Sequence, residues 1–283
     1  MKNGAVRWLV VMVTAIGLSA CESVAEKQDP LAENVVDEAN LNDLMLTAND
    51  PSDAAAYFEK SLAREPDRAD FRRGLAISLA RARRYNEAAR VFQELITLNQ
   101  DQPSDRLEYA FVAIKLDRWD DVKTLSQSFP DGLQTPRRYV VDAMVADQNG
   151  EWAVADAAYA RAEKLSSRPA GVLNNWGVSQ MSRGDLSTAA ATFTRAVSFD
   201  PRLFSAKNNL AIVRGLQRDY SLPLVPLEDE ERAIMLNNLG IIAMRQGDER
   251  IAKGLFAAAV DAHPQHYAGA ADKLAVLEAI VQN

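Results

Sequence analysis

The sequence predicts an all-α fold: an α-solenoid of helix–turn–helix repeats with a C-terminal capping helix. The first observation is an asparagine pair that returns in LNNWG at 173–177, KNNLA at 207–211 and LNNLG at 236–240, with spacings of 34 and then 29 residues. The second is a wider self-similarity, because units that start at 170 and 233 carry matching residues at seven places. The third is an ordinary globular composition, 48% apolar and 25% charged, which supplies enough material for a core.

The seven matched places have a physical reason. Small residues let two antiparallel helices approach closely, phenylalanine fills the space between them, glycine permits the turn, and proline ends the second helix. The residues are Trp176, Gly177, Gly184, Ala189, Phe193, Ala196 and Pro201 in one unit, and Leu239, Gly240, Gly247, Ala252, Phe256, Ala259 and Pro264 in the other.

Residues 1–34 are predicted to precede the repeats. A basic start and an apolar run at 8–20, too short to span a membrane, predict a signal peptide over 1–20. The run ends in LSAC, which resembles the lipobox of bacterial lipoproteins and implies cleavage before Cys21 and lipidation of this only cysteine. An uncleaved anchor helix and a free thiol are the alternatives. Residues 21–34 are polar and predict a lipidated flexible tether, and Glu22, in place of the aspartate that retains such lipoproteins in the inner membrane, points to the outer membrane.

The repeat pattern resembles the tetratricopeptide repeat, which implies a right-handed solenoid over 35–283. Units are predicted to start near 35, 69, 103, 136, 170, 204 and 233. The unit from 103 departs most from the pattern, because Val122 stands where the other units have a small residue.

The register breaks once, in the unit that starts at 204. Pro223 and Pro226 exclude a helix interior, so a loop is predicted over 221–232 in place of a second helix. After Pro264, apolar residues fall on one face of a segment that predicts a capping helix at about 266–282.

Chemical motifs are scarce. The chain has no phosphate-binding loop, no cysteine–histidine metal spacing and no nucleophile elbow, which predicts a protein without enzymatic activity, metal, cofactor or small-molecule substrate. His263 and His266 are interpreted as helix-end residues rather than a metal or catalytic pair. The net charge is −7, or −9 without residues 1–20 and their Lys2 and Arg7 (30 − 39), which argues against nucleic acid as a partner.

The asparagines are the first candidate binding residues. In the tetratricopeptide family the first helices line the concave groove, and asparagines there can bond the backbone of an extended peptide, since an amide both donates and accepts. The alternative is that they mainly bond neighbouring turns. The candidates are Asn174, Asn175, Asn208, Asn209, Asn237 and Asn238.

A basic region at 64–84 is the second candidate. It is either a solvated face or an electrostatic dock for an acidic partner or lipid headgroups. The residues proposed for the dock are Arg68, Arg72, Arg73, Arg83 and Arg84.

The lipobox, the tether, the repeats and the break DYSLPLVPLEDEERA together resemble the TadD family, the tetratricopeptide lipoproteins of the tight-adherence (Flp) pilus system. The resemblance implies a scaffold on the periplasmic face of the outer membrane that assists localisation or oligomerisation of the pilus secretin, or binds another pilus-machine component. The alternative is an envelope adaptor lipoprotein for outer-membrane protein insertion or for cell-wall hydrolases.

Overall fold

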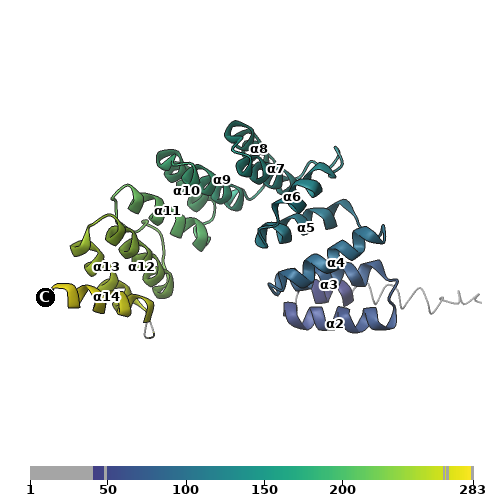
Figure 1. Ribbon diagram of the computed structural model, residues 1–283, viewed down its shortest axis with the longest axis horizontal. Coiled ribbons are helices and arrows are strands. Elements are labelled where there is room, and N and C mark those ends of the chain that lie inside the picture. The colour runs from purple at the N-terminus through teal and green to yellow at the C-terminus, as the bar shows by residue number, and fades with distance from the viewer. Residues whose placement is uncertain (1–40, 48–49, 264, 266–267, 282–283) are drawn as a thin grey trace, which may run out of the picture.

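The protein is an open arch of antiparallel helix pairs (Figure 1). The structure is a computed structural model that describes residues 41–47, 50–263, 265 and 268–281. The predicted signal peptide, Cys21, the tether, Pro264 and His266 lie outside the described residues. None of the described helices is long and apolar enough to cross a membrane.

The described chain is a succession of helices, paired in every unit except the sixth, which confirms the predicted all-α solenoid. Residues 41–47 are helical and precede α2. The remaining helices are α2 (Pro51–Arg64), α3 (Ala69–Arg81), α4 (Tyr85–Thr97), α5 (Pro103–Lys115), α6 (Trp119–Gln127), α7 (Pro136–Gln148), α8 (Trp152–Leu165), α9 (Ala170–Ser182), α10 (Leu186–Phe199), α11 (Phe204–Leu216), α12 (Asp229–Arg245), α13 (Glu249–Ala262) and α14 (Ala268–Val281). Five of them, α3, α5, α7, α9 and α11, begin at the residues where the sequence places unit starts.

The helix crossing within the fifth and seventh units depends on a glycine, which has no side chain. A Cβ atom on Gly177 would lie 2.6 Å from the ring of Phe193, and one on Gly240 would lie 2.7 Å from the ring of Phe256. Both rings are fully buried. The phenylalanine of the second helix therefore fills the space that the glycine of the first helix leaves empty.

The turn between the two helices of a unit needs a residue in the left-handed backbone conformation, with positive φ. Gly184 and Gly247 have φ of +85° and +80°, as their predicted turn role requires. Arg83, Asp117 and Arg218 hold the same register position with φ between 58° and 64°. The fold thus imposes this backbone conformation even where no glycine is present to favour it.

The first helices of the units lie on the inner side of the arch. Successive first helices from α3 to α11 touch one another, whereas no contact of similar extent joins successive second helices among the described residues. Because helices converge on the inner side of a curve, the exposed faces of α3, α5, α7, α9 and α11 form its concave surface (Figure 1).

The break in the sixth unit lies four residues earlier in the chain than predicted. The loop covers 217–228, and residues 229–232, predicted as loop, form the first turn of α12. The backbone N–H of Glu228 donates to Glu231 Oε2 at 3.2 Å, and three acidic residues in the first turn suit the positive end of the helix. This acidic segment, EDEE in the sequence, explains why α12 begins earlier than predicted.

The loop and the last helix close the hydrophobic core. Tyr220 and Leu222 pack against the α12–α13 core, and Val225 packs against the α9–α11 core. The loop therefore covers part of the surface that a second helix would cover. The last helix, α14, packs Ala270 and Leu274 against the α12–α13 core, at the C-terminal end of the arch.

Candidate functional site

A row of apolar side chains runs along the inner face. One register position, the ninth of each unit, carries an apolar residue in all six units from 69 onward: Ile77, Phe111, Met144, Val178, Ile212 and Ile241. Each remains partly or largely open to solvent, and Val178 is 39% exposed. We call this row the inner apolar row. Apolar side chains that stay partly exposed along one face of a molecule are candidates for contact with a partner.

Two cavities hollow the inner face at the middle of the arch, and both touch Phe111. One, of about 210 Å³, lies over α3 and α5 and is lined by Ile77, Tyr85 and Val112 among others. The other, of about 450 Å³, extends over α7, α9 and α11. The two form a groove with an apolar floor.

Arg137 holds Phe111 in this groove. Its guanidinium lies 4.5 Å from the centre of the Phe111 ring and forms an ion pair of 2.9 Å with Glu108. A cation over an aromatic face fixes the ring without covering its edges.

The asparagines bond one another across repeats. Asn209 Nδ2 donates to Asn174 Oδ1 at 3.0 Å, and Asn238 Nδ2 donates to Asn208 Oδ1 at 2.9 Å. Each pair joins the first helices of two successive units. Asn174 and Asn175 also line the larger groove cavity, so these two asparagines can contact a segment bound there. In the unbound chain the paired asparagines serve the contact between repeats.

Asn237 departs from the predicted groove position. Its side chain is only 7% exposed, and its Oδ1 atom is buried without a hydrogen-bond partner among the described residues. Asn237 therefore does not present its amide to the groove.

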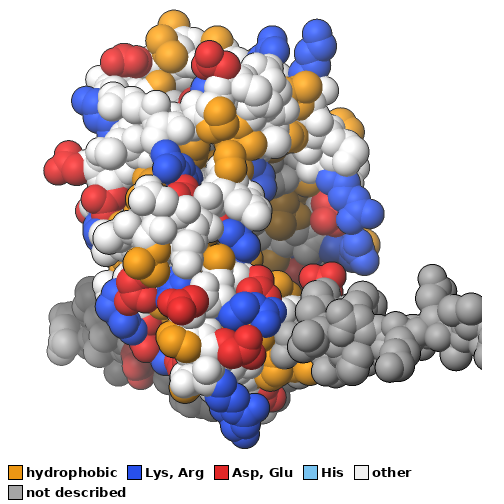
Figure 2. Space-filling model, turned by 90° about the vertical axis from the view of Figure 1, so that its right-hand side faces the viewer, with side chains coloured by type: hydrophobic (Ala, Val, Ile, Leu, Met, Phe, Trp, Pro, Cys, Tyr) orange, Lys and Arg blue, Asp and Glu red, His pale blue; other side chains and the backbone are white. Residues whose placement is uncertain are grey.

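The basic region at 64–84 is largely neutralised within the chain, so the structure does not support a free electrostatic dock. Arg68 bonds both carboxylate oxygens of Asp70, at 2.8 and 2.7 Å, and Arg84 bonds those of Glu87, at 2.7 and 2.6 Å. Arg72 is 9% exposed and bonds Gln100 and the carbonyl of Pro66. Figure 2, which views the N-terminal end of the arch, shows Lys and Arg side chains interspersed with Asp and Glu.

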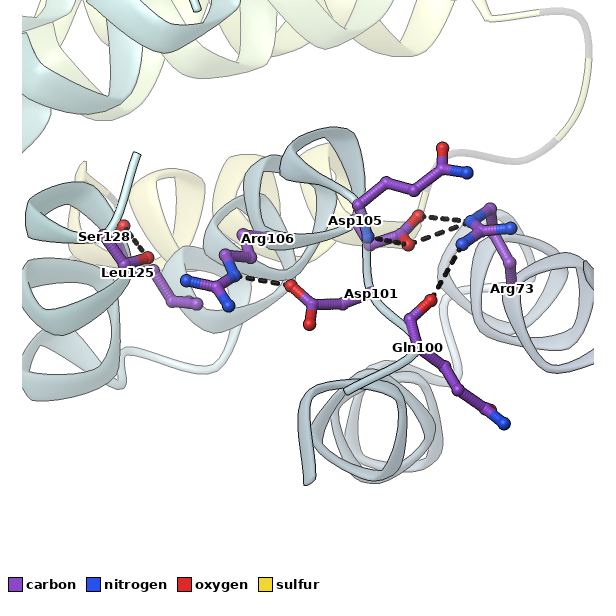
Figure 3. Close-up of polar contacts among 8 residues, drawn as sticks. Arg73, Gln100, Asp101, Asp105, Arg106, Leu125 and Ser128 are labelled. Atoms are coloured by element: carbon purple, nitrogen blue, oxygen red, sulfur yellow. Dashed lines mark hydrogen bonds and ion pairs between the residues drawn. The ribbon is translucent and has the colours of Figure 1, made fainter. Parts of the chain in front are cut away.

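Arg73 joins two repeats (Figure 3). Its Nε lies 2.8 and 2.9 Å from the carboxylate oxygens of Asp105, and its terminal N–H donates to the carbonyl of Gln100 at 3.2 Å. Asp105 is buried and also accepts the backbone N–H of Gln102 at 2.8 Å. This arginine therefore fixes the start of α5. Of the five proposed dock residues, Arg83 is exposed, and no ion pair joins it to another described residue.

The divergent third unit leaves a cavity on the outer side. Helix α6 has nine residues, and a cavity of about 480 Å³ lies between α4, α5 and α6. The Tyr109 hydroxyl donates to Asp121 at 3.0 Å, and Arg118 pairs with the same carboxylate at 2.5 Å. Burial, together with the charge of Asp121, raises the pKa of Tyr109 to about 12. The hydroxyl is thus protonated at neutral pH.

A buried carboxylate links the fourth and fifth units. Asp147 accepts hydrogen bonds from Tyr159 at 3.1 Å and from Ser179 at 2.7 Å, and burial raises its pKa above the ordinary value. Its two oxygens are engaged by packed side chains, so the group serves the contact between repeats. Within the described part of the chain no cluster of His, Cys, Asp or Glu is arranged to hold a metal. His263 Nδ1 accepts the backbone N–H of Gln265 at 3.1 Å, a helix-end contact.

Comparisons with known proteins agree on the repeat. Residues 43–103 and 142–203 match the family model of the tetratricopeptide repeat. The chain is 36% identical over 82 residues to the Photosystem I assembly protein Ycf3 of Rippkaea orientalis, a match that covers 28% of this chain and 47% of that protein. It therefore spans about half the length of this curated relative.

Two solved structures have a similar fold. The crystal structure of the APC/C hetero-tetramer Cut9–Hcn1 matches 83% of this chain and 47% of its own chain, with a TM-score of 0.57 and 15% identity. A tetratricopeptide repeat protein from Parabacteroides merdae matches 88% of this chain and 97% of its own, with a TM-score of 0.54 and 13% identity. At these identities the likeness concerns the fold alone.

Proposed function

We propose, from the tetratricopeptide repeats that form this arch, that the protein is a non-enzymatic scaffold whose inner groove binds a segment of a protein partner. The inner apolar row carries this proposal: six units keep an apolar side chain that remains partly exposed at the same register position of the inner face. Burying such side chains is favourable by about 25 cal/mol per Å² of apolar surface. A partner segment in the groove would supply that burial.

We further propose that the scaffold is anchored by lipid at Cys21 on the periplasmic face of the outer membrane. The sequence LSAC and the polar tether support this, and one acyl chain alone would bind a membrane only marginally, so more than one is needed for stable anchoring. The test is Cys21→Ala, with membrane fractionation as the measurement. Loss of the protein from the membrane fraction is expected, and unchanged membrane association would contradict lipid anchoring.

The partner we propose is a component of a tight-adherence (Flp) pilus machine, with the secretin first. The support is the segment DYSLPLVPLEDEERA, which resembles the TadD family and forms the loop before α12 together with the start of that helix. The name of the curated relative, an assembly protein, supports an assembly role of a general kind.

The experiment is chemical crosslinking in cells, followed by co-purification from detergent-solubilised envelopes. Recovery of the secretin supports the pilus role. Recovery of outer-membrane insertion factors or cell-wall hydrolases instead would show that the adaptor alternative is right. A variant of the inner apolar row, Val178→Arg, and a variant on the second helix α13, Ile251→Arg, form a matched pair, because both residues are 39% exposed. Only the variant of the inner apolar row should lose the partner.

A further inference from the structure

A second exposed surface lies at the edge of the arch, where second helices end and the next first helices begin. The same pair of residues occurs there in two successive units: Leu165 with Arg168, and Phe199 with Arg202, 34 residues apart. Leu165 is 44% and Phe199 58% exposed. We call these four residues the arginine edge.

Three residues of the arginine edge line a recess of about 510 Å³. Arg168, Phe199 and Arg202 line it, with Leu203 and Gly171 among the other lining residues. Three of the lining residues, Arg168, Gly171 and Leu203, also line the larger groove cavity. A polypeptide that lies in the groove can therefore continue over this edge.

The two cations at the recess are weakly engaged. Among the described residues, the Arg168 side chain makes no hydrogen bond or ion pair. The Arg202 side chain is 95% exposed, and its Nε lies 3.7 Å from Asp200. Asp200 is the carboxylate that lines the recess, and it also accepts the backbone N–H of Arg202 at 3.0 Å. Two guanidinium groups thus face one carboxylate, in a chain whose net charge is −7.

The second unit shows what distinguishes this edge. Its corresponding residues are Leu98, which is 51% exposed, and Asp101, whose carboxylate pairs with Arg106 at 2.5 Å. That edge has the apolar residue, but a carboxylate that is already paired stands where the fourth and fifth units have a weakly engaged arginine. The combination of apolar and basic side chains is therefore particular to the fourth and fifth units.

We propose that the arginine edge binds an acidic segment of the protein partner, whose carboxylates pair with Arg168 and Arg202 while an apolar side chain packs against Phe199. This inference rests on the proposed groove function and specifies the chemistry of the partner. Two arginines beside exposed apolar side chains could also meet an anionic lipid surface. The recess and its continuity with the groove favour a polypeptide, because a flat bilayer cannot enter either.

The test uses the full chain in detergent and three probes at physiological ionic strength. They are a fluorescein-labelled peptide in which glutamates alternate with leucine and phenylalanine, the same peptide with lysines in place of the glutamates, and phosphatidylglycerol vesicles. The variant is Arg168→Glu/Arg202→Glu. The matched control is Arg64→Glu/Arg250→Glu, which changes two exposed arginines away from the recess by the same charge.

Fluorescence anisotropy should show that the acidic peptide binds and that the edge variant weakens binding by about tenfold or more, while the control stays close to wild type. Equal weakening in both variants, failure of the acidic peptide to bind, or preference for the lysine peptide would overturn the proposal. Vesicle binding that falls in the edge variant while peptide binding is unchanged would assign the edge to lipid. Circular dichroism checks that both variants remain folded.

Val178→Gln, which removes an apolar side chain of the inner row without adding charge, separates this inference from the groove function. Loss of peptide binding in Val178→Gln, with wild-type affinity in the edge variant, would leave the groove function standing and refute the edge. The opposite result would support the edge and count against the groove.

Discussion

At the residue scale, the space that Gly240 leaves empty sets the crossing of α12 and α13. A Cβ atom there would approach three ring atoms of Phe256 to between 2.7 and 3.0 Å. We expect Gly240→Ala to destabilise the protein by about 1–3 kcal/mol, less the gain of up to about 1 kcal/mol in helix propensity. Urea unfolding measures the change. Combining it with Phe256→Leu should recover part of the loss, and a Gly240→Ala variant more stable than wild type would contradict the packing described.

Two asparagines with different surroundings should respond in opposite directions. Asn209→Ala removes a hydrogen bond between repeats and should cost about 0.5–1.5 kcal/mol. Asn237→Leu removes a buried oxygen that has no described partner, so its effect on stability should be neutral or stabilising. Thermal unfolding of the two variants gives the comparison. A clearly destabilised Asn237→Leu would mean that the Asn237 amide is satisfied after all.

Tyr109 predicts a pH dependence at the alkaline end. Its pKa in the folded chain is about 12, against an ordinary value of 10.0. Below pH 10 the hydroxyl is protonated in both the folded and the unfolded state, and its contribution to the free energy of unfolding is fully present. Between pH 10 and 12 the unfolded state loses the proton first, so stability falls. Urea unfolding across this range should show a steeper loss for wild type than for Tyr109→Phe, and parallel curves would contradict the raised pKa.

At the scale of elements, a comparison of Arg73 with Arg83 distinguishes an arginine that joins two repeats from one that is exposed. Arg73→Ala leaves the buried Asp105 carboxylate without its cation and should destabilise the protein by about 3 kcal/mol. Arg83→Ala keeps the backbone of the turn and removes no ion pair, so it should stay within about 0.5 kcal/mol of wild type. Chemical denaturation of both measures the difference. Equally small losses of stability in both variants would contradict the structural role of Arg73.

The bounds of a helix can be predicted from the sequence where the residues that set them lie close together in the chain. The starts of five first helices follow from the 34-residue period, since each is marked by packing residues at fixed offsets. The start of α12 at Asp229 departs from the period, because a local capping contact of Glu228 and Glu231 lengthens the helix. The arginines of the basic region pair with carboxylates that the fold brings near them, such as Asp105 from the next repeat. No local sequence pattern shows which carboxylates these are.

At the scale of the whole molecule, the period predicts a solenoid, and the contacts between first helices make it an open arch (Figure 1). The inner apolar row was legible in the sequence at a single offset within each repeat, yet its exposure becomes apparent only when the arch is assembled. The asparagines stood out more in the sequence because amides are poor helix formers. The arch uses four of them to join repeats, and Asn174 and Asn175 also line the groove cavity.

The central claim is that the inner face, and not the outer one, contacts a protein partner. Val178 on α9 and Ile251 on α13 test it directly, because both are 39% exposed and lie on a first and a second helix. A photo-crosslinking amino acid is placed at each position in turn in the full chain in its own membranes. We predict a protein adduct from position 178 and none from position 251. Equal adducts from both positions, or an adduct from 251 alone, would contradict the account.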